Sequence, residues 1–536
     1  MSQASAYDAI IIGGGHNGLV CAAYLGAAGL KTLVLEARDT IGGCAVTQEF
    51  HPGFRNSVAA YTVSLLNPKI IRDLDLASHG LRIVPRKLSN FLPLDDDNYL
   101  KVGAGRTQAE VARFSARDAD RLEAYSARLD ALADFLRAVA QETPPNVSSG
   151  GAGDWLRQLF RAGKFADRLR RLGLEAERDV LEIFTASAGD YLDHWFESAP
   201  IKAAYGFDSV VGNYASPYAP GSAYVLLHHC FGEVNGLKGQ WGHAIGGMGA
   251  ITQAMAKAAA VRGVEIRTAS PVREVLIEKG RAAGVVTQKG EAFRGKIIVA
   301  NVNPKLLYRD LVPQDALPAD FRDRIGRWRC GSGTFRMNVA LSELPDFSAL
   351  PGRDVAEHHT AGIIIAPSLR YMEDAYFDAR RFGWSQNPIV EMLIPSTLDD
   401  TLAPKGAHVA SLFCQHVAPV LPDGRSWDDH RDEVADLMIA TVDRYAPNFR
   451  ASVIARQIFS PLDLERTFGL VGGDIFHGAL DLGQLFSARP MLGHADYRGP
   501  VGGLYMCGAG THPGGGVTGL PGRNAAREIL RDAGRG

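Results

Sequence analysis

Residues 8–36 read DAIIIGGGHNGLVCAAYLGAAGLKTLVLE, and this stretch decides the fold. Its β-branched run over 8–12 predicts a buried parallel strand. A glycine turn follows at once, and from Leu19 small and apolar residues recur at helical spacing up to Gly29. A second buried strand is predicted over 32–36. Strand, tight turn, helix and strand together form a complete βαβ unit, so we expect an α/β fold built on a parallel sheet.

The glycine turn itself matches a dinucleotide-binding pattern. Gly13, Gly15 and Gly18 stand in the spacing G-x-G-x-x-G between the predicted strand and helix. In such a turn the first glycine permits the sharp bend, the second lets the backbone approach a pyrophosphate, and the third allows close helix packing. Glu36 follows 18 residues after Gly18, where a carboxylate can accept both hydroxyls of an adenosine ribose. The unit therefore predicts a Rossmann-like nucleotide-binding domain.

The composition is that of a globular protein that binds a small ligand. The 536 residues carry 57 Lys and Arg against 59 Asp and Glu, which gives a formal net charge of −2. Because the chain as a whole is nearly neutral, it has no strong positive potential to hold a polyanion, and nucleic acid is not expected as a partner. A chain of this length should form two or three lobes. Its 59 glycines suit close approaches of the backbone to a ligand.

Cysteine usage and the start of the chain point to a reducing compartment. The six cysteines include no C-x-x-C pair, which argues against a disulfide framework and against a zinc site. The first residues lack the basic region of a secretory signal. The apolar window over 9–30 contains six glycines, His16 and Asn17, so it does not predict a membrane-spanning helix. We therefore expect a cytoplasmic protein.

Residues just beyond Glu36 bear on which dinucleotide is bound. Glu36 favours a free ribose 2′-hydroxyl, whereas Arg38 could be interpreted as a clamp for the 2′-phosphate of NADP. The diglycine Gly42-Gly43 begins six residues after the carboxylate. This arrangement resembles the signature of glutathione-reductase-like FAD proteins, particularly their amine oxidase and phytoene desaturase branch, in which an arginine at the place of Arg38 is common. The resemblance implies FAD as the cofactor, with Glu36, Arg38, Gly42 and Gly43 at its site.

A second glycine-rich segment lies near the end of the sequence. Residues 508–522 read GAGTHPGGGVTGLPG, between a predicted buried strand over 503–507 and a predicted closing helix. Gly514, Gly516 and Gly519 repeat the G-x-G-x-x-G spacing, but the 17 residues after Gly519 cannot supply a further strand and a ribose-binding carboxylate. We therefore expect no second nucleotide domain and no tightly bound NAD(P)H.

This segment resembles the C-terminal FAD signature of the phytoene desaturase family. The resemblance implies that Gly508, Gly510, Thr511 and Gly519 lie along the ribityl chain and the isoalloxazine. It makes His512 a candidate for chemistry or for a hydrogen bond to the flavin, the alternative being a histidine that only shapes the loop. The segment has neither the acidic residue that many amine oxidases use for a ribityl hydroxyl nor an aromatic pair to face the flavin. The desaturase branch is therefore favoured.

Similarity to the family extends through the middle of the chain. Gly246-Gly247-Met248 resembles the family's GGM motif, and the step over 270–272 resembles the strand whose backbone at Val272 contacts adenine. The chain is similar to the phytoene desaturase-like group of carotenoid desaturases and ketolases, which also contains pyridine nucleotide-disulphide oxidoreductase domain-containing protein 2. The disulfide chemistry in that last name does not fit this sequence, because no redox cysteine pair is present.

The resemblance also implies how the chain is divided. We expect a discontinuous FAD-binding domain of the glutathione-reductase type, an α+β substrate domain and a helical region. The FAD domain is expected over 1–105, 235–305 and 490–536, the helical region over 106–234, and the substrate domain over 306–489.

Two further patterns concern a metal and a membrane. The pairs His228-His229 and His358-His359 are not expected to bind a metal, because neighbours on a strand face opposite ways and no acidic or cysteine partner stands at metal-ligand spacing. Residues 154–174 form a basic amphipathic segment. It is interpreted either as a helix whose arginines are solvated or paired with acids over 175–179, or as an element that lies on a membrane surface.

By resemblance, the chain is an FAD-dependent oxidoreductase that transfers a hydride to the flavin from a long apolar substrate, either isoprenoid and carotenoid-like or lipid-like. The reaction can be desaturation, isomerisation or ketone formation. The electron acceptor can be oxygen or a quinone. The alternatives are a protein that holds FAD only for structure or partner binding, and a flavin amine oxidase. No catalytic acid or base is assigned. An apolar substrate favours a peripheral location at the inner face of a membrane.

Overall fold

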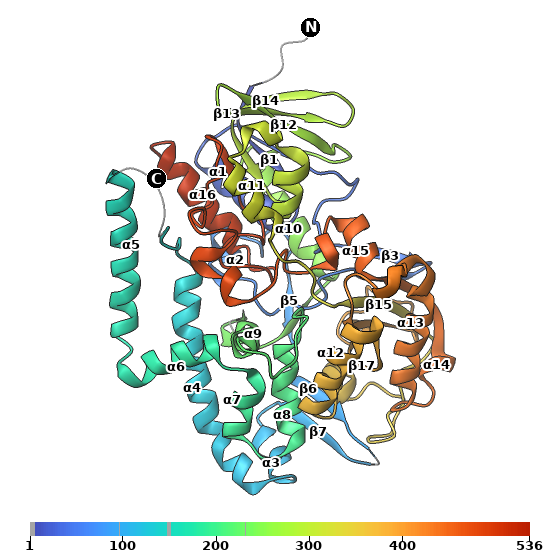
Figure 1. Ribbon diagram of the computed structural model, residues 1–536. Coiled ribbons are helices and arrows are strands. Elements are labelled where there is room, and N and C mark those ends of the chain that lie inside the picture. The colour runs from blue at the N-terminus through green and yellow to red at the C-terminus, as the bar shows by residue number, and fades with distance from the viewer. Residues whose placement is uncertain (1–5, 96, 147–151, 231, 536) are drawn as a thin grey trace.

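The computed structural model describes residues 6–95, 97–146, 152–230 and 232–535 (Figure 1). A seven-stranded sheet forms its first layer, with the order β11-β2-β1-β14-β13-β12 and with β20 beside β14. Its parallel strands are β1 (Ala6–Ile12), β2 (Thr32–Leu35), β11 (Glu265–Arg267), β14 (Ala292–Ala300) and β20 (Leu504–Met506). The antiparallel strands are β12 (Val272–Glu278) and β13 (Arg281–Thr287). The α/β fold with a sheet assembled from distant segments is confirmed.

Helices cover both faces of this sheet. On one face, α1 (His16–Ala27) packs against α10 (Met248–Ala260) and α16 (Leu520–Asp532) in one apolar core. The other face is covered by α11 (Ala319–Gly326) and the residues just before it. The contact between α1 and α16 depends on Gly522, because a Cβ atom there would lie 2.1 Å from the Asn17 carbonyl oxygen.

A second seven-stranded sheet has the order β19-β15-β18-β17-β16-β6-β7. Its strands are β6 (Leu88–Pro93), β7 (Tyr99–Gly103), β15 (Phe335–Leu341), β16 (Gly362–Ile365), β17 (Trp384–Leu393), β18 (His408–Val417) and β19 (Val453–Phe459). Helix α12 (Leu369–Phe382) packs on one face and α13 (Trp427–Asp443) on the other. Because β6 and β7 belong to this sheet, the range 1–105 contributes to both sheets. The division into domains at these boundaries stays a prediction.

The chain between strands β7 and β8 is mainly helical. Its helices are α3 (Thr107–Ala112), α4 (Ala116–Ala140), α5 (Ala152–Arg170), α6 (Leu174–Thr185), α7 (Ala188–Trp195), α8 (Ala199–Gly206) and α9 (Ser222–His229). Ser115 separates α3 from α4, because its hydroxyl accepts a hydrogen bond from the Asp118 amide and caps the second helix.

The remaining short elements connect these layers. They are β3 (Thr47–His51), β4 (Phe54–Ser57), α2 (Pro68–Asp73), β5 (Ile83–Pro85), β8 (Glu233–Val234), β9 (Leu237–Lys238), β10 (Gly242–Ala244), α14 (Phe449–Ser452) and α15 (Pro461–Phe468).

Helix α5 corresponds to the predicted basic segment and stands at the edge of the molecule (Figure 1). Several of its basic residues face inward: Arg161 pairs with Glu528 at 2.8 Å, and Lys164 pairs with Glu142 at 2.9 Å. The expected pairing with acids over 175–179 is wrong, since two of those acids pair with Arg128 of α4. In the described part of the chain, no helix has the length and apolar character needed to cross a membrane.

Candidate cofactor and substrate site

A cavity of about 510 Å³ opens where the parallel strands of the first sheet end. Residues that follow β1, β2 and β14 form one end of it, and further walls come from segments within 59–65, 466–477 and 509–517. Ligands of open α/β sheets bind in the crevice outside the carboxyl ends of the strands. The cavity therefore lies where the sequence places a nucleotide.

The glycine turn leads directly into helix α1 at this end. Gly13 and Gly15 line the cavity. Gly13 has a φ of +98°, which favours glycine, and a Cβ atom on it would lie 3.1 Å from the Asn301 carbonyl oxygen. Gly15 is the N-cap of α1, and no side chain caps the helix there. The amides of the first turn of α1 are thus left for an anionic group such as a pyrophosphate.

Glu36 lines the same end of the cavity and is held by backbone amides. One carboxylate oxygen accepts a hydrogen bond from the Gly14 amide at 2.7 Å, and the other accepts one from the Arg38 amide at 2.9 Å. Each carboxylate oxygen has a second lone pair. The fixed carboxylate can therefore also accept hydrogen bonds from the hydroxyls of a ribose.

Arg38 and Val272 lie in the cavity wall beside Glu36, as the resemblance implied. The Arg38 guanidinium stacks on the ring of Phe468, 4.8 Å from its centroid, and its Nη1 atom has no protein partner. Gly43 also lines the cavity. Gly42 lies behind the wall, where its amide donates to the carbonyl of the glycine turn at 2.9 Å. These positions fit the predicted roles, which stay predictions.

The C-terminal motif reaches the cavity through other residues than those predicted. Among the described residues, the cavity wall includes Ala509 and the run 515–517, but not the four predicted positions of this motif. Those four lie behind the wall or at the start of α16: Gly508, Gly510, Thr511 and Gly519. The motif therefore shapes the cavity wall, but the predicted residues of the motif support the residues of the wall and do not themselves line the cavity.

His512 does not belong to the cavity wall that the structure describes. Its Nε2 atom pairs with the Val139 carbonyl oxygen of α4 at 3.2 Å, and its ring contacts the ring of Phe486. Burial lowers the pKa of His512 to about 4, so the ring is neutral. This position fits a histidine that shapes the loop, and it gives no support to a role in chemistry.

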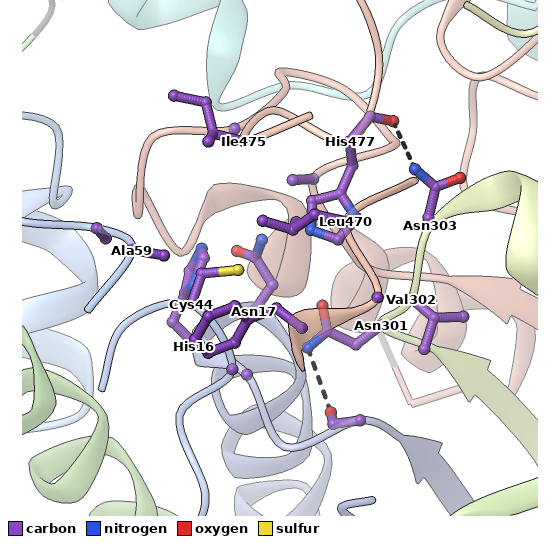
Figure 2. Close-up of a pocket in the computed structure, with 18 of the residues that line it drawn as sticks. His16, Asn17, Cys44, Ala59, Asn301, Val302, Asn303, Leu470, Ile475 and His477 are labelled. Carbon is purple, nitrogen blue, oxygen red and sulfur yellow. Dashed lines mark hydrogen bonds between the residues drawn. The ribbon is translucent and has the colours of Figure 1, made fainter. Parts of the chain in front are cut away.

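Several polar residues of the cavity were missed by the sequence analysis. His16 and Asn17 stand between the glycines of the first motif, and His477 comes from the segment before the last strand; Figure 2 shows all three among the residues that line the cavity. His16 Nε2, Asn17 Oδ1 and His477 Nδ1 are buried and have no hydrogen-bond partner in the protein. Burial lowers the pKa of His16 to about 3 and that of His477 to about 4.

Unpartnered polar atoms inside a cavity are expected to bond a ligand, because burying them unsatisfied is costly. A dinucleotide supplies phosphates, ribose hydroxyls and ring heteroatoms along its length. The residues present therefore fit FAD: the turn of α1 for the pyrophosphate, Glu36 for the ribose, and the polar side chains beyond it for the flavin half.

The reasoning about the histidine pairs needs a correction. His228 and His229 lie on helix α9, and His358 and His359 lie on a short 3₁₀ helix over Glu357–Thr360, so none of them is on a strand. His229 lines the cavity, and its Nδ1 atom pairs with the Val225 carbonyl oxygen at 2.9 Å. Among the described residues, no group of three or more His, Cys, Asp or Glu side chains could hold a metal ion.

The far part of the cavity is apolar with a few hydroxyls. Its apolar lining comes from segments that connect the sheets and from the helical region: Ala59, Ala60, Leu65, Val211, Trp241, Leu470, Ile475 and Phe476. Tyr61, Thr62 and Ser64 add hydroxyl groups. A single cavity thus joins a nucleotide-binding turn to a compartment suited to an apolar molecule.

Comparisons with known proteins agree with this geometry. A family model described as flavin containing amine oxidoreductase matches residues 18–334. The chain is 41% identical to the rat pyridine nucleotide-disulfide oxidoreductase domain-containing protein 2, over 98% of this chain and 94% of that protein. It is 26% identical to one of the subunits of limonene dehydrogenase from Castellaniella defragrans, over 100% and 96% of the two chains. Phytoene desaturase (lycopene-forming) of Pantoea ananas is also 26% identical, over 96% of each chain.

A solved structure shows the same fold. The oxidoreductase from Methanosarcina mazei aligns with a TM-score of 0.60 at 15% identity, over 98% of this chain and 100% of that one. The family match and the 41% identical relative support the suspected phytoene desaturase-like family. The chain therefore belongs to the flavin containing amine oxidoreductases, and it is an oxidoreductase with FAD as its cofactor.

Proposed function

We propose that this oxidoreductase dehydrogenates, isomerises or oxidises a long apolar substrate, either isoprenoid or lipid-like. One observation carries the proposal: the cavity runs without interruption from the nucleotide-binding turn to a compartment lined mainly by apolar side chains. An apolar substrate held there would lie against the flavin half of the cofactor. Two relatives support this class of substrate, since one is named for limonene and the other for phytoene.

The chain contributes binding and orientation, and bound FAD supplies the acceptor for a hydride. Leu65 and Val211 in the wall exclude water from the apolar compartment. His16, Asn17 and His477 offer neutral hydrogen-bonding groups near the glycine turn. The structure singles out no catalytic acid or base, so the proposal names the substrate class and not the reaction.

Anaerobic titration of the FAD-loaded protein tests the proposal. A panel of isoprenoid hydrocarbons, apolar alcohols and polyamines is added, and loss of the visible absorbance of oxidised flavin is followed. We expect bleaching by apolar compounds and none by polyamines. Bleaching by polyamines would favour an amine oxidase. Isomerisation leaves the flavin oxidised, so the compounds are also analysed for products, and neither bleaching nor any product would favour a protein that holds FAD without turnover.

A pair of variants connects the bleaching to the cavity. Val211→Trp fills the apolar compartment, because Val211 is buried in its wall. Val420→Trp is the matched control, since Val420 is 80% exposed and lies outside the described wall. The first variant should lose bleaching and keep FAD, whereas the second should keep both.

We also propose that the outer face of α5 contacts a membrane surface, from which an apolar substrate could enter. Trp155, Leu156, Leu159 and Phe160 project from this face with more than half of each side chain exposed. Their insertion, rather than the basic residues that pair with Glu142 and Glu528, would hold the protein there. Flotation with vesicles tests this: serine at all four positions should abolish recovery in the lipid fraction, and unchanged recovery would refute the proposal.

A further inference from the structure

Two buried arginines stand behind the cavity wall without an anionic partner. Arg86 is 4% exposed and Arg336 is fully buried. Within the described part of the chain, no carboxylate oxygen lies within 4.0 Å of a guanidinium nitrogen of either residue. Buried charges in proteins are normally paired, because an unpaired one costs several kcal/mol.

Arg336, on strand β15, bonds neutral groups only. Its Nη1 atom donates to the Leu412 carbonyl oxygen at 2.7 Å, and its Nη2 atom donates to the Ser411 hydroxyl at 2.8 Å. Its Nε atom has no partner. The guanidinium carbon lies 4.5 Å from the centroid of the Tyr61 ring. The positive charge is therefore placed directly behind a residue of the cavity wall.

Arg86, which follows β5, stands behind the next residue of the same wall. Its Nη2 atom donates a short hydrogen bond to Thr62 Oγ1. Thr62 lines the cavity, and its hydroxyl donates a long hydrogen bond of 3.3 Å to the Gly242 carbonyl oxygen. Arg86 occupies a lone pair of Oγ1, so a ligand can bond Thr62 only by accepting its hydroxyl hydrogen in place of this long bond.

The nearby acids supply at most one negative charge. Glu391 is buried and accepts a hydrogen bond from the Tyr61 hydroxyl at 2.5 Å. Asp208 interacts electrostatically with Glu391, and burial raises its pKa well above the usual value, which favours the neutral carboxyl group. Two guanidinium groups against one carboxylate leave an excess of at least one positive charge at this wall.

We propose that the cavity binds a long-chain carboxylic acid, with the carboxylate end accepting the hydroxyl hydrogen of Thr62. The carboxylate of such a ligand offsets excess positive charge at this wall. The apolar chain of the acid occupies the compartment lined by Leu65 and Val211. This inference rests on the proposed function, and it narrows the substrate or ligand class to apolar molecules with an acidic end.

Binding measurements on the FAD-loaded protein test the inference. Palmitic acid, its methyl ester and hexadecanol are titrated, and the difference spectrum of the bound flavin reports occupancy of the cavity. Palmitate should bind about tenfold more tightly than the alcohol or the ester, since two fixed positive charges lie within several Å of its carboxylate.

Substitutions assign the preference to the proposed residues. Arg86→Met and Thr62→Val should each reduce the preference for the acid over hexadecanol about tenfold, while Arg86→Lys should retain the preference. Arg72→Met, which removes an exposed positive charge on α2, is the control. FAD content and the thermal unfolding midpoint verify folding. Thr62→Val keeps the side-chain volume, so it decides the question if Arg86→Met does not fold.

Equal binding of acid and alcohol by the native protein would overturn the inference. So would a preference for the acid that survives in both variants. If palmitate does not bind but an isoprenoid hydrocarbon bleaches the flavin, the inference fails and the proposed function stands. If no apolar compound binds or bleaches, both fail together.

Discussion

Replacing Glu36 by glutamine should weaken FAD binding without disturbing the fold. The carboxylate accepts the amides of Gly14 and Arg38, one on each oxygen. Glutamine keeps the size of the side chain but has only one acceptor oxygen. It can therefore accept from only one of the two amides, and its NH₂ group faces the other N–H donor. The ribose hydroxyls also lose a charged acceptor.

The size of the effect follows from the number of hydrogen bonds lost. A hydrogen bond to a charged group contributes about 1.5–3 kcal/mol. Losing one such bond to the ribose corresponds to about a 10- to 150-fold increase in the Kd for FAD. Losing the hydrogen bond from the Gly14 amide would increase the Kd further, because that amide belongs to the glycine turn.

Reconstitution of the apoprotein with FAD, followed by quenching of flavin fluorescence, measures the Kd. Glu274→Gln is the matched control, since Glu274 lies on the same sheet but pairs only with Arg273 at the surface. Similar thermal midpoints for the two variants would show that folding is intact. A Kd for Glu36→Gln within about threefold of the native value would refute the assignment of Glu36 to the ribose.

Three further outcomes are expected. Glu528→Gln should lower stability at neutral pH by about 3 kcal/mol, because the fully buried Glu528 carboxylate loses its ion pairs with Arg161, Arg498 and Arg531. The pKa of Glu528 is lowered to about 2 by its arginine partners, so this contribution is complete above about pH 4.5 and is lost as the pH falls towards 2; thermal unfolding of both proteins across this range checks it. Gly522→Ala should reduce FAD content by forcing α16 away from α1, whereas Gly326→Ala, where a Cβ atom meets nothing within 4 Å, should not; flavin absorbance per protein measures this. NADPH at low micromolar concentration should not copurify or rapidly reduce the flavin, since only one nucleotide motif has the required strand, helix and carboxylate.

The first sheet could be predicted because its signals are local. Strand β1, the glycine turn, α1 and β2 follow one another in a stretch where each boundary has its own residue signal. The second sheet could not be predicted in this way. Strands β15 and β18 are buried on both faces almost throughout, so even the polar residues that alternate with apolar ones in β15, Arg336 and Asn338, do not mark an exposed face. Their pairing with each other and with β6 and β7 through the sheet depends on tertiary structure.

Of the predicted site residues, Gly13, Gly15, Gly43 and Glu36 line the cavity, whereas its unpartnered polar side chains were not predicted. His16 and Asn17 occupy the variable places of the first motif, where the pattern carries no information about the residue type. Arg336 looked like any residue of a mixed α+β region, and only the fold brings it to Tyr61. The histidine pairs lie on helical turns and not on the expected strands. Long-range contacts therefore account for most of what was missed.

The glycines of the two motifs share a neighbour that neither motif contains. A Cβ atom on Gly13 would lie 3.1 Å from the carbonyl oxygen of Asn301, and one on Gly18 would lie 2.9 Å from its Nδ2 atom. From the other end of the chain, a Cβ atom on Gly508 would lie 3.1 Å from Asn301 Oδ1. Asn301 Nδ2 also donates to the Gly13 carbonyl oxygen at 3.2 Å.

Packing around Asn301 thus explains why glycine is needed at positions that do not themselves line the cavity. Gly18 and Gly508 let three segments, from the start, middle and end of the sequence, converge at the carboxyl ends of β1, β14 and β20. Asn301 lines the cavity, so this convergence fixes part of its wall. The glycines then serve the cofactor in two ways: Gly13 and Gly15 by leaving room for it, and the others by holding the chain together around it.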